Sequence, residues 1–170
     1  MIAYTTAPGR GAMDELLYGV AQRLLQRGLR PVGTVQINTD RDHGGPCDMD
    51  VQLLPDGATI RISQDLGPHA KGCRLDPEAL ATAVGFVEQR LGEGADCLIV
   101  NKFGKSEADG RGFRRAIGEA MSLGIPVLVG LNQLNSQAFL DFTEGLATEI
   151  APSEEALVTW FLRHLSPAKG

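Results

Sequence analysis

The stretch Thr5-Thr6-Ala7-Pro8-Gly9-Arg10-Gly11-Ala12-Met13-Asp14 decides the fold that this sequence predicts. It follows a short apolar segment, residues 1–4, and precedes residues 16–25, in which apolar side chains recur at helical spacing. A strand that passes through a glycine-containing loop into a helix presents backbone N–H groups at the helix start, where they can bind an anion. The stretch therefore has the layout of a phosphate-binding loop.

The same stretch lacks the side chains with which a working loop of this kind binds triphosphate and magnesium. In the motif G-x-x-x-x-G-K-[S/T], the lysine neutralises the terminal phosphates and the hydroxyl group holds Mg²⁺. Aligned with this motif, Thr6 stands at the first glycine and Gly11 at the second. Ala12 then stands at the lysine and Met13 at the hydroxyl residue. We therefore expect a nucleotide-hydrolase scaffold, a degenerate P-loop, that has lost triphosphate hydrolysis.

Length and composition narrow the class of protein. The 170 residues are 43% apolar and 22% charged, which fits one globular domain over residues 1–170. No apolar run approaches the roughly 20 residues that span a bilayer, and three cysteines are an odd and sparse set. We therefore expect a soluble cytoplasmic protein with reduced thiols. The net charge of -5 and the 5% aromatic content argue against nucleic acid as a partner.

Strand-like and helix-like segments alternate along most of the chain. Residues 97–100 form a short continuous apolar run, as expected of a central parallel strand that is covered on both faces. Asp76, followed by Pro77, and Ser153 have the residue types of helix N-caps. The other predicted strands are residues 1–4, 32–37, 125–129 and 146–150. This order predicts an α/β fold, a three-layer P-loop-like domain with a mostly parallel sheet.

An inserted hairpin interrupts this alternation. Residues 49–53 and 58–62 alternate between apolar and polar side chains on either side of the turn sequence Pro55-Asp56-Gly57. This pattern predicts an antiparallel β-hairpin. The preceding residues 38–48 are polar and lack periodicity, which is typical of a loop.

Polar residues follow two of the predicted strands, at the ends where open α/β sheets bind ligands. One end follows Tyr4, and the other reads Val100-Asn101-Lys102-Phe103-Gly104-Lys105. We expect the two ends to be neighbours in the sheet. A triphosphatase would offer an acid for Mg²⁺ after the second strand, but Asn101 and Lys102 stand there instead. An amide supplies no negative charge for a divalent cation, and a lysine repels one.

The layout resembles the cancer-related nucleoside-triphosphatase family of P-loop proteins over nearly the whole chain. The Ala7-Pro8-Gly9-Arg10-Gly11 loop, the hairpin, residues 98–105 and residues 125–129 carry this resemblance. The resemblance implies a P-loop fold. The sequence departs from the family at each catalytic position. Ala12 replaces the lysine and Met13 the hydroxyl residue, and Asn101 and Lys102 stand in place of the acids.

The sequence looks still more like a bacterial family known only as a domain of unknown function. Its motifs here are Cys47-Asp48-Met49-Asp50, Ile62-Ser63-Gln64-Asp65-Leu66-Gly67 and Gly72-Cys73-Arg74-Leu75-Asp76-Pro77. Members of that family resemble P-loop hydrolases and often lie near molybdate-uptake genes. The resemblance names no reaction or cofactor, and its genomic association suggests a role with oxyanions.

The predicted site binds a small anion, either a nucleotide or an oxyanion such as molybdate, without hydrolysing triphosphate. Backbone N–H groups of residues 9–11 would donate to the anion, Arg10 and Lys102 would neutralise it, and Asn101 would orient it. Asp14, in the first helical turn, would compete with a phosphate or repel it. The predicted ligand-binding residues are Thr5, Thr6, Gly9, Arg10, Gly11, Asn101, Lys102 and Lys105. The alternative is that the glycines only form a tight turn and that the lysines are solvated.

Other functions stay open at this point. The same scaffold can be a non-catalytic protein-interaction module that presents the hairpin and residues 38–48, as a homodimer or with a protein partner. Two His-x-x-x-Cys patterns, residues 43–47 and 69–73, also allow a thiol- or zinc-dependent enzyme, although their spacing differs from the usual structural zinc sites. Whether His43, Cys47, His69 and Cys73 approach one another does not follow from the sequence. Cys97, inside an apolar strand, is expected to be a core residue.

Overall fold

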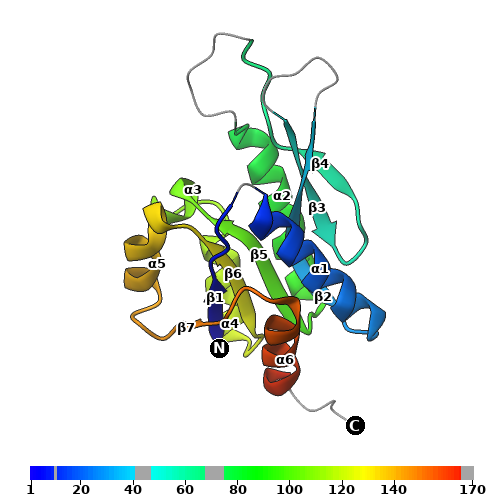
Figure 1. The fold of residues 1–170 in the computed structure, drawn as a ribbon, viewed down its shortest axis with the longest axis vertical. Helices are drawn as coiled ribbons and strands as arrows, with labels where there is room; N and C mark the ends of the chain where they lie inside the picture. Colours follow the sequence, from blue (N-terminus) through cyan, green and yellow to red (C-terminus); the bar gives the residue numbers. More distant parts are fainter. Residues whose placement is uncertain (10, 41–46, 68–74, 166–170) are drawn as a thin grey trace.

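A seven-stranded sheet with the order β4-β3-β2-β5-β6-β1-β7 runs through the protein (Figure 1). The computed structural model describes residues 1–9, 11–40, 47–67 and 75–165. Neighbouring strands from β2 to β7 in this order are parallel, which confirms the predicted mostly parallel sheet. The strands are β1 (Ile2–Thr5), β2 (Pro31–Thr39), β3 (Asp48–Leu54), β4 (Thr59–Arg61), β5 (Cys97–Phe103), β6 (Val127–Leu131) and β7 (Thr148–Glu149).

The antiparallel hairpin is also confirmed, and it extends the sheet beyond β2 (Figure 1). β3 pairs with β4 on one side and, over its full length, with residues 33–39 of β2 on the other, as far as the pair Thr39 and Asp48. β2 therefore continues through residues 38 and 39, for which the sequence predicted a loop. Pairing with β3 satisfies the backbone groups of these polar residues, so their side chains do not have to favour a strand.

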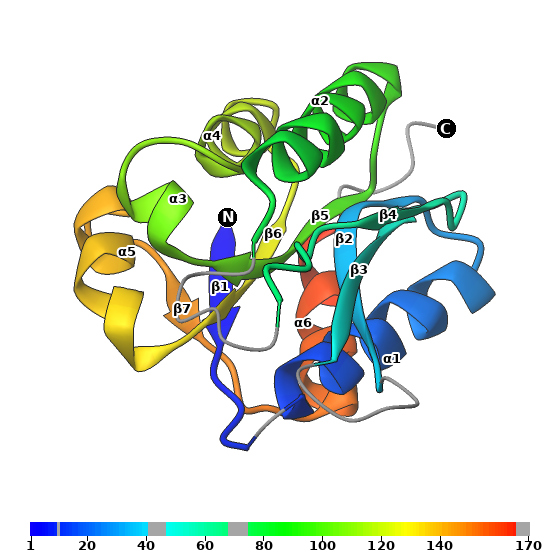
Figure 2. The same cartoon turned by 90° about the horizontal axis from the view of Figure 1, so that it is seen from above.

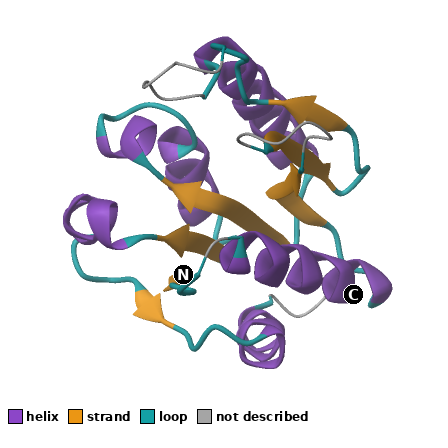
Figure 3. Ribbon diagram, turned by 45° about the horizontal axis from the view of Figure 1, so that its top comes forward, coloured by secondary structure: helices purple, strands orange, loops and turns teal. Residues whose placement is uncertain are grey.

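Helices cover both faces of the sheet. Figures 2 and 3 show the strands between two helical layers, with α1 and α6 on one side and α2 and α4 on the other. This arrangement confirms the predicted three layers. The helices are α1 (Ala12–Gln26), α2 (Pro77–Glu93), α3 (Lys105–Ala108), α4 (Arg114–Ser122), α5 (Ser136–Phe142) and α6 (Glu154–His164). In the described part of the chain, none of them is long and apolar enough to cross a bilayer.

Helix starts differ in how their first backbone N–H groups are satisfied. The Asp76 carboxylate accepts hydrogen bonds from the N–H groups of Glu78 and Ala79, and the Ser153 hydroxyl accepts one from Ala156. Both predicted caps are therefore confirmed. α1 begins instead at Gly11, which has a φ of 76° and no side chain with which to cap the helix. A residue with a Cβ atom rarely adopts this φ, which explains the glycine at this point of the loop.

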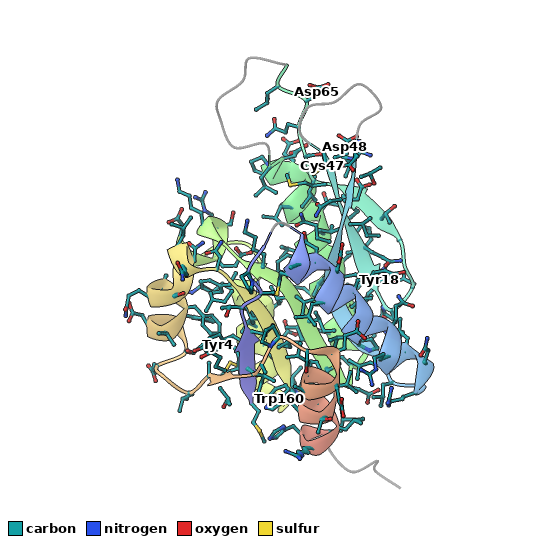
Figure 4. All side chains as sticks on the ribbon, viewed as in Figure 1. Tyr4, Tyr18, Cys47, Asp48, Asp65 and Trp160 are labelled. Atoms are coloured by element: carbon teal, nitrogen blue, oxygen red, sulfur yellow. The ribbon has the colours of Figure 1, made fainter. Side chains whose placement is uncertain are left out.

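Two apolar clusters hold the layers on the sheet. Leu98 and Val100 of β5 belong to the cluster beneath α2 and α4, whereas Cys97 and Ile99 belong to the cluster beneath α1 and α6. Cys97 is completely buried, as predicted, and burial raises the pKa of its thiol above the ordinary range. Trp160 of α6, labelled in Figure 4, belongs to the second cluster.

Candidate functional site

The carboxyl ends of three parallel strands surround the candidate site. β6 lies between β1 and β5, since Val127 pairs with Ile2 on one side and with Leu98 on the other. The prediction that the ends of β1 and β5 are direct neighbours is therefore wrong. Hydrophobic periodicity defines each strand but not its place in the sheet, so the intervening strand could not be inferred from it. The end of β6 consequently contributes to the site.

β5 has a bulge at Asn101 and Lys102. Val100 pairs with Val129 and Phe103 pairs with Leu131, so β5 uses one residue more than β6 over this interval. In a regular strand, two residues three positions apart point to opposite faces. Val100 and Phe103 nevertheless belong to the same apolar cluster, as the bulge between them allows. Asn101 is buried beneath α1 and Lys102 is exposed. The sequence predicted the strand end at residue 100, three residues too early.

A hollow of about 700 Å³ lies where these strand ends meet the loop before α1. We call it the strand-end hollow. It brings together four of the predicted site residues, Thr6, Gly9, Asn101 and Lys102. The full lining consists of Thr6, Ala7, Pro8, Gly9, Met13, Asp14, Gln36, Asn101, Lys102, Gly130, Leu131, Asn132 and Gln133.

The remaining predicted site residues have other positions. Thr5 is completely buried, and its hydroxyl group donates a hydrogen bond of 2.9 Å to the backbone oxygen of Ile150. Lys105 is exposed on α3 and lies outside the lining of the hollow. Gly11 lines a second hollow on the other side of Asp14. Arg10 lies outside the described residues. The described site is therefore smaller than the predicted one.

A closed ring of hydrogen bonds connects the strand-end hollow with the first turn of α1. The Asp14 carboxylate accepts one bond of 2.7 Å from the side-chain amide of Asn101 and another of 2.6 Å from that of Asn38. The oxygen of the Asn101 amide accepts the backbone N–H of Gln36 at 2.9 Å. The side-chain amide of Gln36 donates to the Asn38 oxygen, also at 2.9 Å. The ring therefore connects α1, β2 and β5.

The donors in this ring face both oxygens of Asp14. A backbone N–H can only donate, so Gln36 determines that the oxygen of Asn101 faces β2 and that its NH₂ group faces Asp14. The Asn38 NH₂ group also donates to Asp14, and the Asn38 oxygen accepts from the side-chain amide of Gln36. Both carboxylate oxygens therefore accept hydrogen bonds from NH₂ groups.

The second hollow, of about 730 Å³, lies beside the first turn of α1 and the end of β2, and we call it the outer hollow. Asp14 and Gln36 line both hollows and separate them. The outer hollow has three acidic residues, Asp14, Glu15 and Asp40, together with the partly exposed Tyr18 that is labelled in Figure 4. Of the two hollows, only the strand-end hollow has a lysine, Lys102, in its described lining.

Sequence reasoning missed three polar residues of the strand-end hollow. Gln36 lies inside β2, and Asn132 and Gln133 directly follow β6. The position of Asn132 after a continuous apolar strand was a usable signal, because ligands bind at strand carboxyl ends. The Asn132 side chain also caps the following 3₁₀ turn (Gln133–Asn135) by accepting the backbone N–H of Asn135 at 3.1 Å. No sequence pattern indicated Gln36.

A buried carboxylate fixes the loop that follows Lys102. Glu107 of α3 is 4% exposed and accepts backbone N–H groups from Gly104 at 3.0 Å and from Phe113 at 3.1 Å. Its two oxygens therefore join both ends of residues 104–113, the segment that carries Lys105. Arg114 contacts the backbone oxygen of Glu107 and lies over the Phe142 ring.

The zinc and thiol alternatives rest mainly on residues outside the described ranges. His43, His69 and Cys73 all fall there, and Cys47 is a partly buried residue next to β3 that lines the outer hollow. Within residues 1–9, 11–40, 47–67 and 75–165, no group of three or more His, Cys, Asp or Glu residues is arranged to hold a metal ion.

The fold is an α/β fold of the P-loop nucleoside-triphosphatase type with an added antiparallel hairpin. A crystal structure of THEP1 from the hyperthermophile Aquifex aeolicus is similar over 98% of this chain and 100% of that one, with a TM-score of 0.62 and 14% sequence identity. This similarity confirms the predicted fold class. The chain belongs to the family described as protein of unknown function (DUF2478), whose model matches residues 2–160.

A curated relative provides a link to molybdenum. The chain is 35% identical over 149 residues to the molybdenum import ATP-binding protein ModC 2 of Bradyrhizobium diazoefficiens. The match covers 88% of this chain but only 17% of that relative, so the chain corresponds to a small part of that longer relative. The predicted resemblance to a family of unknown function with a molybdate association is therefore confirmed.

Proposed function

We propose that this protein is a degenerate P-loop-like domain that binds a small anionic ligand in the strand-end hollow and does not hydrolyse triphosphate. The ligand is a nucleotide or an oxyanion related to molybdate. The observation that carries the proposal is the composition of the strand-end hollow. The exposed Lys102 and the loop residues 6–9 before α1 both line it. The lysine supplies positive charge, and the loop supplies backbone N–H groups for an anion.

The absence of hydrolysis follows from the side chains around α1 and β5. Met13 lines the hollow at the position where the motif places the hydroxyl group for Mg²⁺. Asn101 stands where an acid would bind that cation, and both ends of its amide are already engaged, by Asp14 and by Gln36. Lys102 adds a positive charge that disfavours a divalent cation. Asp14 is the one described carboxylate in the lining of the hollow, and both of its oxygens already accept amide hydrogen bonds, so it is poorly placed to position Mg²⁺ against a terminal phosphate.

The nature of the ligand rests on the curated relative. That relative is named as an ATP-binding protein of molybdenum import. The name supports either a nucleotide or molybdate as the ligand. Because the chain spans 17% of the relative, the transport activity of the whole protein does not extend to this chain. The proposal is limited to binding of an anion of one of these two kinds.

Calorimetric titration with ATP, GTP, phosphate and molybdate tests the proposal. We expect saturable heat with at least one of them, and we expect Lys102→Ala to weaken that binding about tenfold, which corresponds to the loss of one charge-assisted contact. Arg115→Ala is the matched control, since it removes a cation from α4 whose side chain is 85% exposed. No heat with any of the four ligands would contradict binding, and isolation of a stable complex with another protein would then favour the interaction-module alternative.

A steady-state assay of phosphate release tests the second half of the proposal. We expect no release of phosphate from ATP or GTP above a protein-free control, with or without Mg²⁺. Magnesium-dependent release by the purified protein that disappears when Arg10 is substituted would show that the loop still supports hydrolysis.

A further inference from the structure

We propose that Asp14 determines which anions the strand-end hollow accepts, and that it selects compact oxyanions over polyphosphate chains. This inference rests on the proposed function and narrows its ligand class. The ligand would be a small oxyanion, of the size of phosphate or molybdate, bound between Lys102 and the loop residues 6–9. A nucleoside triphosphate would be a poor ligand because its phosphate chain would extend towards the Asp14 carboxylate.

The first argument is the position of this carboxylate. Asp14 is in the first turn of α1, and its side chain lines the strand-end hollow together with Lys102. The hollow therefore contains one described cation and one described carboxylate. An anion gains from the lysine and is repelled by the acid, and the repulsion increases with each additional negative charge on the ligand.

The second argument is that Asp14 cannot easily move out of the way. Its two oxygens accept hydrogen bonds from the amides of Asn101 and Asn38, at 2.7 Å and 2.6 Å. Asn101 is buried, and the backbone N–H of Gln36 holds its amide in the orientation that donates to the acid. A rotation of Asp14 away from a ligand would leave the Asn101 NH₂ group, which is buried, without its acceptor.

The third argument concerns the N-terminus of α1. Gly11 provides no cap, so the positive end of the helix dipole is available to an anion. In a working P-loop this end attracts the phosphates. Here the Asp14 carboxylate lies in the same first turn and complements the dipole itself. A phosphate chain that reached the helix would have to compete with an anion that is already part of the protein.

Titration of four forms of the protein with molybdate, phosphate and ATP tests this inference. The forms are the wild type, Asp14→Asn, Asp14→Ser and the control Glu15→Gln, which removes the same charge from the neighbouring exposed residue that does not line the strand-end hollow. We expect the wild type to bind molybdate or phosphate more tightly than ATP. Both Asp14 variants should shift this ratio towards ATP by about tenfold or more, and the control by less than about threefold.

Each outcome separates the inference from the proposed function. Equal or tighter binding of ATP by the wild type would overturn the inference, and this measurement needs no variant that has to fold. An unchanged ratio in folded Asp14→Asn or Asp14→Ser protein would also overturn it, while oxyanion binding by the wild type would leave the proposed function intact. If only the Asp14 variants bind ATP and the wild type binds no anion, the role of Asp14 is supported and the proposed function is contradicted. No binding by any form contradicts both.

Discussion

The side chains of Asp14 and Asn101, 87 residues apart in the sequence, are joined by a hydrogen bond of 2.7 Å between α1 and β5. A triphosphatase of the P-loop type holds Mg²⁺ between a hydroxyl group, which aligns here with Met13 next to Asp14, and an acid, which aligns with Asn101. In this protein a carboxylate on the helix and an amide on the strand contact each other directly. The contact stabilises the arrangement of the two elements without a metal ion.

The first prediction concerns the charge of the ring. Asn101→Asp places a second carboxylate next to Asp14 in a buried position, and we expect it to lower the free energy of unfolding by about 2–4 kcal/mol at pH 7. Because one acid of such a pair binds a proton more readily in the folded state, the loss should diminish below about pH 5. Urea unfolding at both pH values measures this. Asn38→Asp, at the exposed end of the ring, is the control and should have less than half the effect.

The second prediction concerns Gly130, which lines the strand-end hollow. A Cβ atom here would collide with the backbone oxygen of Asn101, so Gly130→Ala must push β6 away from the β5 bulge. We expect a loss of about 2 kcal/mol or more in the free energy of unfolding. Gly118→Ala in α4, where a Cβ atom meets no neighbour within 4 Å, should instead stabilise the protein by about 0.5–1 kcal/mol. Equal effects of the two substitutions would contradict this account of the bulge.

The third prediction concerns the Glu107 carboxylate. Glu107→Ala leaves the backbone N–H groups of Gly104 and Phe113 without their buried acceptor, and we expect a loss of about 2–4 kcal/mol in urea unfolding. Glu107→Gln keeps one acceptor oxygen and should lose about half as much. Asp109→Asn, on the partly exposed side of the same segment, serves as the control. A neutral Glu107→Ala variant would show that the carboxylate does not hold this loop.

The fourth prediction is a pH dependence at the hairpin turn. The hydrogen bond from Arg90 holds the pKa of Asp56 below its ordinary value of 3.8. A lowered pKa in the folded state contributes stability above the unfolded value, and this contribution is lost as the pH falls through the folded value. Since the Asp56 side chain is 53% exposed, we expect Asp56→Asn to cost less than about 1 kcal/mol at pH 7. The difference from wild type should shrink as the pH falls below 3.8 and through the folded value, as chemical unfolding over a pH series would show.

The sequence predicted the alternation of strands and helices because local signals encode it. Asp76 and Ser153 are caps whose side chains act within three residues of the helix start, and the apolar run from Cys97 reflects burial on both faces of β5. The hairpin was predicted for the same reason, since its turn sequence and its alternating strands are contiguous. These features require no knowledge of distant contacts.

The site depended on distant contacts and was predicted only in part. The place of β6 between β1 and β5, and the bulge at Asn101 and Lys102, arise from strand pairing that no local pattern specifies. The partners of Asp14 come from two other strands, so its role as a fixed anion could not be derived from its position in the helix alone.

The most direct test of the account is the location of an anion in a crystal of this protein grown or soaked with molybdate. Molybdenum scatters strongly and gives an anomalous signal that identifies it without ambiguity. The account predicts one dominant peak in the strand-end hollow, within hydrogen-bonding distance of the Lys102 ammonium group and of backbone N–H groups from residues 6–9. A dominant peak elsewhere, or an empty hollow in crystals whose protein binds molybdate in solution, would contradict it.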